Sequence, residues 1–288
     1  MASHPSWIKV RVPTPAQSVG MAEMRALLSR HNLETVCQGA QCPNAVECWS
    51  AHTATFMVLG DTCTRGCRFC DVPTGNPHGA IDKTEPQRLA TAVGELGLKY
   101  VVLTSVDRDD VSDGGADAFA RVVEAITESA PDVRIEMLMP DFSGSHSALD
   151  RMVSSRADVF GHNLETVRRL SPELRDRRAG YEQSLDVLRY LASVSGGRAV
   201  KSSLMVGLGE TLDELRETMA DLCEAGVTVL TLGQYLQPSM GAAPVDRFVP
   251  PEEFVVLEAY ARGLGFTSVV AGPLVRSSYH AAAAYRET

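Results

Sequence analysis

The chain has 288 residues, 44% of them apolar and 22% charged, a composition typical of a soluble globular protein. Its net charge of -9 argues against a general nucleic-acid binder, which needs a basic surface, and against docking on an anionic membrane. The first residues lack the apolar stretch of a secretory signal, and no run approaches the ~20 apolar residues of a membrane helix. We therefore expect a cytoplasmic protein with no nucleic-acid or membrane partner.

The first fifty residues contain Pro13, Pro15 and Pro43 and few periodic apolar positions, so we expect irregular structure there. From residue 53 onward, apolar runs alternate with segments whose apolar residues recur at helical spacing, such as Leu89, Val93 and Leu96. The runs predicted as buried strands are 53–60, 100–106, 134–140, 158–165, 199–209, 227–236 and 268–274.

This alternation predicts an α/β protein with a parallel sheet and helices outside it. Six strand–helix units favour a partial (β/α)6 barrel of the TIM type, and a doubly wound open sheet is the alternative. In either fold the functional site lies at the carboxyl ends of the strands.

Six of the seven cysteines lie between residues 37 and 70, in two sets of three. The second cysteine set, Cys63, Cys67 and Cys70, directly follows the first predicted strand. Structural zinc normally takes four protein ligands, and a thioredoxin-type pair needs only two cysteines. Three thiolates on a [4Fe–4S] cluster leave one iron open to bind a substrate or cofactor.

The first cysteine set, Cys37, Cys42 and Cys48, has four and then five residues between its members. Zinc ribbons favour tighter pairs, so zinc is a minor interpretation. A second [4Fe–4S] cluster on this set requires a fourth ligand from elsewhere. Cys223 is the one remaining cysteine, and its place beside the apolar face of a predicted helix favours a small buried hydrophobe.

The second set, with Phe69 before its last cysteine, resembles the motif of the radical S-adenosylmethionine superfamily. The whole chain resembles one family within it, the lipoyl synthases. "CQGAQCPNAVECW" is similar to that family's auxiliary-cluster motif, and "ATFMVLGDTCTRGCRFCDV" is similar to its radical motif. Further blocks follow in the family's order: "TSVDRDDVSDGGA", "PDF", "HNLETV", "KSSLMVGLGET" and "VVAGPLVRSSYHA".

The resemblance implies two [4Fe–4S] clusters and S-adenosylmethionine as cofactors. The radical cluster would be held by the second cysteine set, and its open iron would chelate S-adenosylmethionine. The auxiliary cluster would be held by the first cysteine set, with Ser278 of "RSSY" as its fourth ligand. A serine oxygen is a weak ligand beside thiolates, which suits a cluster that must open. The implied catalytic residues are Cys63, Cys67, Cys70 and Ser278.

The implied reaction inserts two sulfur atoms, donated by the auxiliary cluster, at carbons six and eight of a protein-bound octanoyl chain. The chain would be carried on a lysine of a lipoyl domain of a 2-oxo acid dehydrogenase or of the glycine cleavage H protein. An electron donor such as ferredoxin or flavodoxin would reduce the clusters. The implied division is an N-terminal extension carrying the first cysteine set (1–52), the barrel (53–265) and a C-terminal extension carrying "RSSY" (266–288).

We expect contacts to S-adenosylmethionine from Phe69, Thr104, Asn163, Glu165 and Lys201. A structural ion pair is the alternative for Lys201. Three further segments leave alternatives open. Residues 114–115 either form a turn before a helix or hold the cofactor. "GLGE" (207–210) weakly resembles a phosphate-binding loop, but no lysine follows it, so a backbone wall against adenine or ribose is favoured. The basic stretch 168–178 is a solvated face or a carrier-binding surface.

Two other functions remain to be separated from a lipoyl synthase. One is a different radical enzyme with an auxiliary cluster, and the other is an iron–sulfur electron carrier or a zinc-stabilised scaffold. Zinc without sulfide would exclude both radical enzymes.

Overall fold

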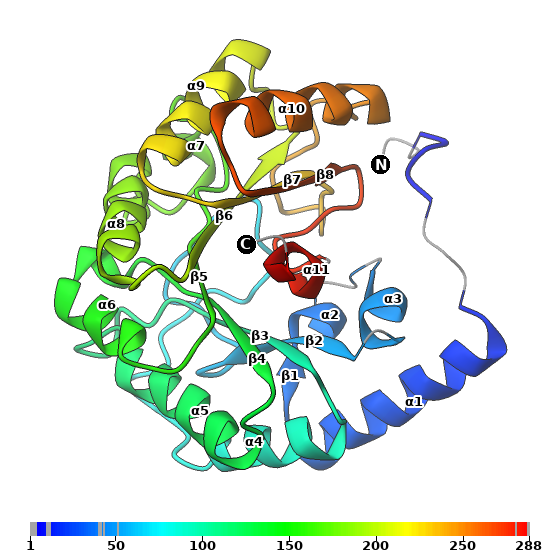
Figure 1. Cartoon of the computed structure of the whole chain (residues 1–288), viewed down its shortest axis with the longest axis vertical. Coiled ribbons are helices and arrows are strands. Elements are labelled where there is room, and N and C mark those ends of the chain that lie inside the picture. The colour runs from blue at the N-terminus through cyan, green and yellow to red at the C-terminus, as the bar shows by residue number, and fades with distance from the viewer. Residues whose placement is uncertain are drawn as a thin grey trace. The chain divides into compact units, whose positions relative to one another are not determined.

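The computed structural model describes residues 5–9, 13–39, 42, 44–50, 52–279 and 281–286. Its strands, β1 to β8, follow chain order (Figure 1). The chain divides into two compact units. The β1–β4 unit comprises residues 11–65 and 72–160, and the β6–β8 unit comprises residues 1–10, 66–71 and 161–288. The short strand β5 (Val159–Gly161) lies at the division between them, and the three-part division of the chain stays a prediction.

The β1–β4 unit is a sheet with helices packed beside one another along it (Figure 1). Strand β2 is parallel to β3, and β3 is parallel to β4, whereas the two-residue β1 is antiparallel to β2. In chain order the elements are α1 (Pro15–Arg30), β1 (Glu34–Thr35), α2 (Val36–Gly39), α3 (Ala45–Ser50), β2 (Thr53–Val58), α4 (Glu85–Glu95), β3 (Tyr100–Ser105), α5 (Ala116–Ser129), β4 (Arg134–Leu138), the 3-10 turn η1 (Phe142–Gly144) and α6 (His146–Val153).

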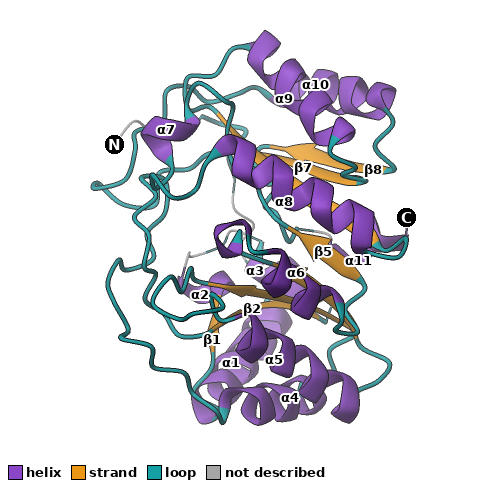
Figure 2. Ribbon diagram, turned by 90° about the vertical axis from the view of Figure 1, so that its left-hand side faces the viewer, coloured by secondary structure: helices purple, strands orange, loops and turns teal. Residues whose placement is uncertain are grey.

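The β6–β8 unit repeats the same plan, and its helix α10 packs on β7 and β8 (Figure 2). Strand β6 is parallel to β7, and β7 is parallel to β8. Its elements are α7 (Ser171–Leu174), α8 (Tyr181–Val194), β6 (Ala199–Val206), α9 (Leu212–Glu224), β7 (Val229–Gln234), α10 (Pro251–Leu264), β8 (Ser268–Gly272) and α11 (Ala281–Arg286).

Alternate residues of β6 and β7 point to opposite faces of the sheet, as the pleat of a strand requires. Leu204 and Leu232 are register partners and are fully buried. Ser203 and Thr231 are register partners on the other face, which also carries Lys201. All six residues of β7 are buried, so both faces of this strand are covered.

The predicted strands and the helices between them are confirmed, although the predicted strand 158–165 is reduced to the three residues of β5. The prediction of irregular structure in the first fifty residues is wrong. Helix α1 begins with a capping box, in which the side chains of Thr14 and Gln17 bond each other's backbone N–H groups. Its Leu27 and Leu28 are buried.

No helix among the described residues is long and apolar enough to cross a membrane.

The capping box of α9 gives a test of local stability. The Thr211 hydroxyl accepts the N–H of Glu214 at 3.3 Å, and the Glu214 carboxylate accepts the N–H of Thr211 at 2.8 Å. Thr211→Ala is expected to cost about 1 kcal/mol because the first N–H groups of the helix lose an acceptor. The melting temperature should fall by about 2 °C in differential scanning fluorimetry. Thr91→Ala, at an exposed position inside α4, is the control. It should not lower the melting temperature, since alanine favours the helix.

Candidate functional site

The second cysteine set follows β2, as predicted from the sequence. Two backbone hydrogen bonds fix the start of its loop: Cys63 N–H donates to the Pro73 carbonyl at 2.8 Å, and Gly75 N–H donates to the Cys63 carbonyl at 2.9 Å. Cys63 belongs to the β1–β4 unit, and Cys67 and Cys70 belong to the β6–β8 unit. Each part of the loop is anchored within its own unit by charged side chains.

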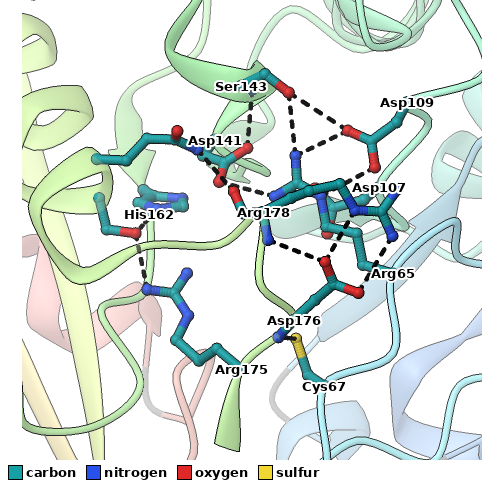
Figure 3. A network of polar contacts seen from close by, with 12 residues as sticks. Arg65, Cys67, Asp107, Asp109, Asp141, Ser143, His162, Arg175, Asp176 and Arg178 are labelled. Atoms are coloured by element: carbon teal, nitrogen blue, oxygen red, sulfur yellow. Dashed lines mark hydrogen bonds and ion pairs between the residues drawn. The ribbon is translucent and has the colours of Figure 1, made fainter. Parts of the chain in front are cut away.

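Arg65 anchors the loop in the β1–β4 unit (Figure 3). Its guanidinium, with only 2% of the side chain exposed, donates two hydrogen bonds to Asp109, at 2.8 and 3.0 Å, and one to Asp141 at 2.7 Å. Asp107 adds a third carboxylate at 3.3 Å. Burial opposes the charge, but the bonds to Asp109 and Asp141 outweigh it and raise the pKa of Arg65. The loop is thus tied to the segments that follow β3 and β4.

Asp176 anchors the loop in the β6–β8 unit, where it lies beside Cys67 (Figure 3). Its carboxylate accepts the N–H of Gly66 at 3.0 Å, and its own N–H points at the Cys67 sulfur at 3.3 Å. Arg68 N–H donates to the Leu174 carbonyl at 2.7 Å. Hydrogen bonds from Arg178 hold the pKa of the Asp176 carboxyl well below its usual range, against the opposing effect of burial.

Two sulfur atoms of the second cysteine set therefore receive backbone amides. Arg65 N–H donates to Cys63 Sγ at 3.4 Å, and Asp176 N–H donates to Cys67 Sγ. Hydrogen bonds from backbone N–H groups to sulfur stabilise thiolates and adjust the reduction potential of iron–sulfur clusters. The three cysteines and these N–H donors therefore fit a cluster. None of the described cysteines forms a disulfide. No three described His, Cys, Asp or Glu side chains converge to hold a single metal ion, and a cluster does not need them to, because each thiolate binds a different iron.

Tyr235 and Arg68 extend the site at the end of β7. The Tyr235 hydroxyl donates to the Ala243 carbonyl at 2.8 Å, and the Ala243 N–H donates to the Arg68 carbonyl at 2.7 Å. Burial, with the negative charges of Cys70 and Asp71, raises the pKa of Tyr235 to about 12. The phenol thus stays protonated and fixes the chain that supports the cysteine loop.

The first cysteine set lies in the β1–β4 unit and is half-buried. Cys42 N–H donates to the Cys37 carbonyl at 3.0 Å, and Cys48 lies in α3, where its N–H donates to the Asn44 carbonyl. This backbone turn keeps the Cys37 and Cys42 segments adjacent. Ser278, the predicted fourth ligand, is half-buried in the β6–β8 unit.

Of the residues predicted to contact S-adenosylmethionine, Thr104, Asn163 and Glu165 lie at or after the carboxyl ends of strands. Thr104 is the half-buried penultimate residue of β3, and Phe69 is half-buried in the cysteine loop. Asn163 and Glu165 follow β5, and Lys201 is buried on the neighbouring β6. The structure brings Asn163 and Glu165 together through a side-chain hydrogen bond.

Glu165 has an unusual backbone for a non-glycine residue, with φ of 71°. Its N–H donates to the Ser203 carbonyl at 3.0 Å, and its carbonyl accepts from Met205 at 2.9 Å, so the strained residue is held by β6. Desolvation raises the pKa of its carboxyl, and Arg175 and Asn163 partly offset this effect. Strain of this kind gathers at functional sites.

Local hydrogen bonds define the structure of two of the three segments for which the sequence left alternatives open. The carboxylate of Asp113 accepts the N–H groups of Gly115 and Asp117, each at 2.9 Å, so the Gly114–Gly115 segment forms the turn that starts α5. In "GLGE" the Glu210 carboxylate accepts the N–H groups of Gly207 and Leu208, at 2.6 and 2.9 Å. These amides are therefore occupied by the protein's own side chain.

The basic stretch 168–178 is only partly the solvated face that its charges indicate. Arg168 pairs with Glu182 and Asp221, and Arg169 pairs with Glu214. Arg175 is buried and donates to the Ser184 hydroxyl at 2.8 Å. Neither Arg65 nor Asp176, the two anchors of the cysteine loop, was predicted from the sequence. Arg65 could have been noticed because it lies between Cys63 and Cys67, whereas no pattern in the sequence points to Asp176.

A cavity of about 520 Å³ opens beside Arg65 within the β1–β4 unit. Its lining comes from the segments after β3 and β4 and includes Asp113, Gly114 and Phe142. The cavity therefore lies at the carboxyl ends of parallel strands, the place where sites of such sheets form.

The profile of the radical SAM superfamily matches residues 57–222, more than half of the chain. The lipoyl synthase of Thermus thermophilus is 53% identical to this chain over 277 residues, which cover 96% of this chain and 85% of that protein. The lipoyl synthase of Pyrobaculum aerophilum is 52% identical over 285 residues, which cover 98% of this chain and 96% of that protein. The chain belongs to the lipoyl synthase family.

Solved structures agree on the fold. The FeFe-hydrogenase maturase HydG from Carboxydothermus hydrogenoformans superposes with a TM-score of 0.63 at 14% identity, over 94% of this chain and 69% of that one. Streptococcus suis SuiB bound to S-adenosylmethionine superposes with a TM-score of 0.56 at 13% identity, over 94% and 56%. The predicted partial TIM-type barrel is thereby confirmed, and the sequential strand order β1 to β8 differs from that of a doubly wound sheet.

Lipoyl synthase membership also confirms the predicted activity and cofactors. The protein is a radical sulfurtransferase of lipoate biosynthesis that acts on a protein-bound octanoyl chain. S-adenosylmethionine and [4Fe–4S] clusters come with this family.

Arg65 provides the test of the loop anchor. Arg65→Met should destabilise the apoprotein by about 3–5 kcal/mol, because the buried Asp141 loses its counter-charge. The midpoint of urea unfolding measures this loss. Arg189→Met removes an exposed ion pair with Asp186 and, as the control, should cost less than about 1 kcal/mol. Equal midpoints for the two variants would mean that Arg65 does not anchor the loop.

Proposed function

We propose that this lipoyl synthase binds its radical cluster through the second cysteine set and its auxiliary cluster through the first cysteine set and Ser278. The observation that carries the proposal is the presence of both cysteine sets and "RSSY" in a chain about half identical to lipoyl synthases along nearly its whole length. The amides directed at Cys63 and Cys67 support the assignment of the second set.

When bound, the reduced radical cluster supplies the electron that cleaves S-adenosylmethionine to a radical able to abstract hydrogen from unactivated carbon. The auxiliary cluster is the sulfur substrate. Carbons six and eight of the octanoyl chain carry no activating group, so no acid or base on the protein can remove their hydrogens. The task of this chain's residues is therefore to hold the reactants and to keep water away from them.

S-adenosylmethionine is held, in this proposal, by Phe69, Thr104, Asn163, Glu165 and Lys201. The positions of Thr104, Asn163 and Glu165 at or after strand ends support this role, as does the strained backbone of Glu165. A carboxylate in a partly desolvated position is a strong acceptor for hydroxyl groups. Glu165, oriented by Asn163, is thus suited to the ribose, and Lys201 is suited to a carboxylate.

The carriers of the octanoyl chain are the lipoyl domains of 2-oxo acid dehydrogenases and the glycine cleavage H protein. Ferredoxin or flavodoxin is the electron donor. The enzyme acts in the cytoplasm, where free thiols persist and clusters are assembled. The chain consists of the N-terminal extension 1–52, the barrel 53–265 and the C-terminal extension 266–288, with the first cysteine set on one extension and Ser278 on the other.

The decisive experiment is anaerobic incubation of the reconstituted enzyme with S-adenosylmethionine, dithionite and an octanoylated peptide from a lipoyl domain. Mass spectrometry should detect two added sulfur atoms, and iron and sulfide analysis should give about eight of each per chain. An octanoylated peptide from the H protein and free octanoate are incubated in the same way, so that the sulfur added to each substrate can be compared. Cleavage of S-adenosylmethionine without sulfur in the peptide would refute the proposal.

Ser278→Ala tests the fourth ligand. The formation of 5′-deoxyadenosine should remain within about twofold of the wild type, whereas lipoyl product should fall by about 100-fold, since the auxiliary cluster loses its oxygen ligand. The matched control is the adjacent Ser277→Ala, which should keep its product yield. Wild-type yield from Ser278→Ala would remove Ser278 from the ligand set.

A further inference from the structure

The C-terminal segment that carries Ser278 touches β7 at a glycine. A Cβ atom built on Gly233 would lie 2.1 Å from the Val275 carbonyl oxygen and 3.0 Å from its carbonyl carbon. These are backbone atoms, so no side-chain rotation can relieve the overlap. Gly233 therefore lets the backbone of residue 275 lie directly against the strand, which a larger residue at position 233 would prevent.

Arg276 ties the same segment to the next residue of β7. Its guanidinium donates to the Gln234 carbonyl at 3.3 Å and to the Val275 carbonyl at 2.7 Å. The Arg276 carbonyl accepts the N–H of Tyr279 at 2.9 Å. One residue thus closes the turn 276–279 and bonds it to the strand, and Ser278 lies inside that turn.

Gln234, whose carbonyl accepts from Arg276, is itself held in place by side-chain hydrogen bonds. The residue is 1% exposed, and its side-chain amide donates to the Arg247 carbonyl at 3.0 Å while its oxygen accepts the N–H of Val249 at 2.7 Å. The strand end, the segment 247–249 and the C-terminal turn therefore share one hydrogen-bonded group. Further along the chain, α11 packs on β8.

We propose that Gly233, Gln234 and Arg276 form a seat that positions the turn carrying Ser278. The proposal rests on the proposed role of Ser278 as a ligand of the auxiliary cluster. A serine oxygen binds iron weakly, so little binding energy is available to order a loose chain end. The seat supplies that order before the cluster binds, and the hydroxyl is presented at a fixed place. Gly233 and Arg276 are positioning residues in this scheme.

The first test measures the turn itself, without reference to turnover. Hydrogen–deuterium exchange of peptides that cover 273–279 is followed in the full-length protein, with and without reconstituted clusters. Gly233→Ala should accelerate exchange there by about tenfold or more, because the segment must leave the strand. Gly263→Ala is the matched control, since a Cβ at this site in α10 meets nothing within 4 Å. It should exchange as the wild type does.

Arg276→Met is the second variant, and it leaves β7 unchanged. It should also accelerate exchange in 273–279, and Arg276→Lys, which retains a donor for the Gln234 carbonyl, should restore most of the protection. In both Gly233→Ala and Arg276→Met, lipoyl product should fall by about 10- to 100-fold while 5′-deoxyadenosine formation is unchanged. A general loss of structure would reduce both products together.

Wild-type exchange at 273–279 in both Gly233→Ala and Arg276→Met would overturn the seat. Faster exchange at 273–279 with a normal yield of lipoyl product would also contradict the proposal, because the order of the turn would then not matter for the role of Ser278. The role of Ser278 is judged separately by Ser278→Ala, in which the seat is intact and exchange should stay slow. The two proposals therefore fail by different measurements.

Discussion

The guanidinium of Arg65 lies between three carboxylates that arrive from two separate segments, one after β3 and one after β4. A buried arginine is tolerated only when its charge and its N–H groups are matched, and here the surrounding acids satisfy both requirements. The backbone N–H of the same residue donates to the sulfur of Cys63. The ion pairs of Arg65 therefore help to fix the position of Cys63, a proposed cluster ligand.

The alternation of strands and helices could be predicted because buried parallel strands and amphipathic helices have different periods. Helix α1 was not predicted, because the helical spacing of its buried residues Met24, Leu27 and Leu28 extends over little more than one turn. Its start was nevertheless encoded locally, in Thr14, Pro15 and Gln17. Strand β5 was predicted too long because the predicted segment also included "HNLE" (162–165), which ends in the strained turn at Glu165.

The cysteine sets could be identified from spacing, because three thiolates in one loop are a local pattern. Their supports were invisible to the same reasoning. Asp176 is 109 residues from Cys67, and it belongs to a run of arginines and acids that has the composition of an exposed helix end. Only the fold reveals that Arg175 is buried within that run and that Asp176 turns toward the sulfur. Contacts that depend on tertiary structure leave no period in the sequence.

The carboxylate of Glu210 fills the ring of amides at Gly207 and Leu208, where a glycine-rich turn would otherwise attract an anion. The turn thus carries its own permanent counter-ion. A nucleotide phosphate therefore finds no unoccupied N–H group on Gly207 or Leu208.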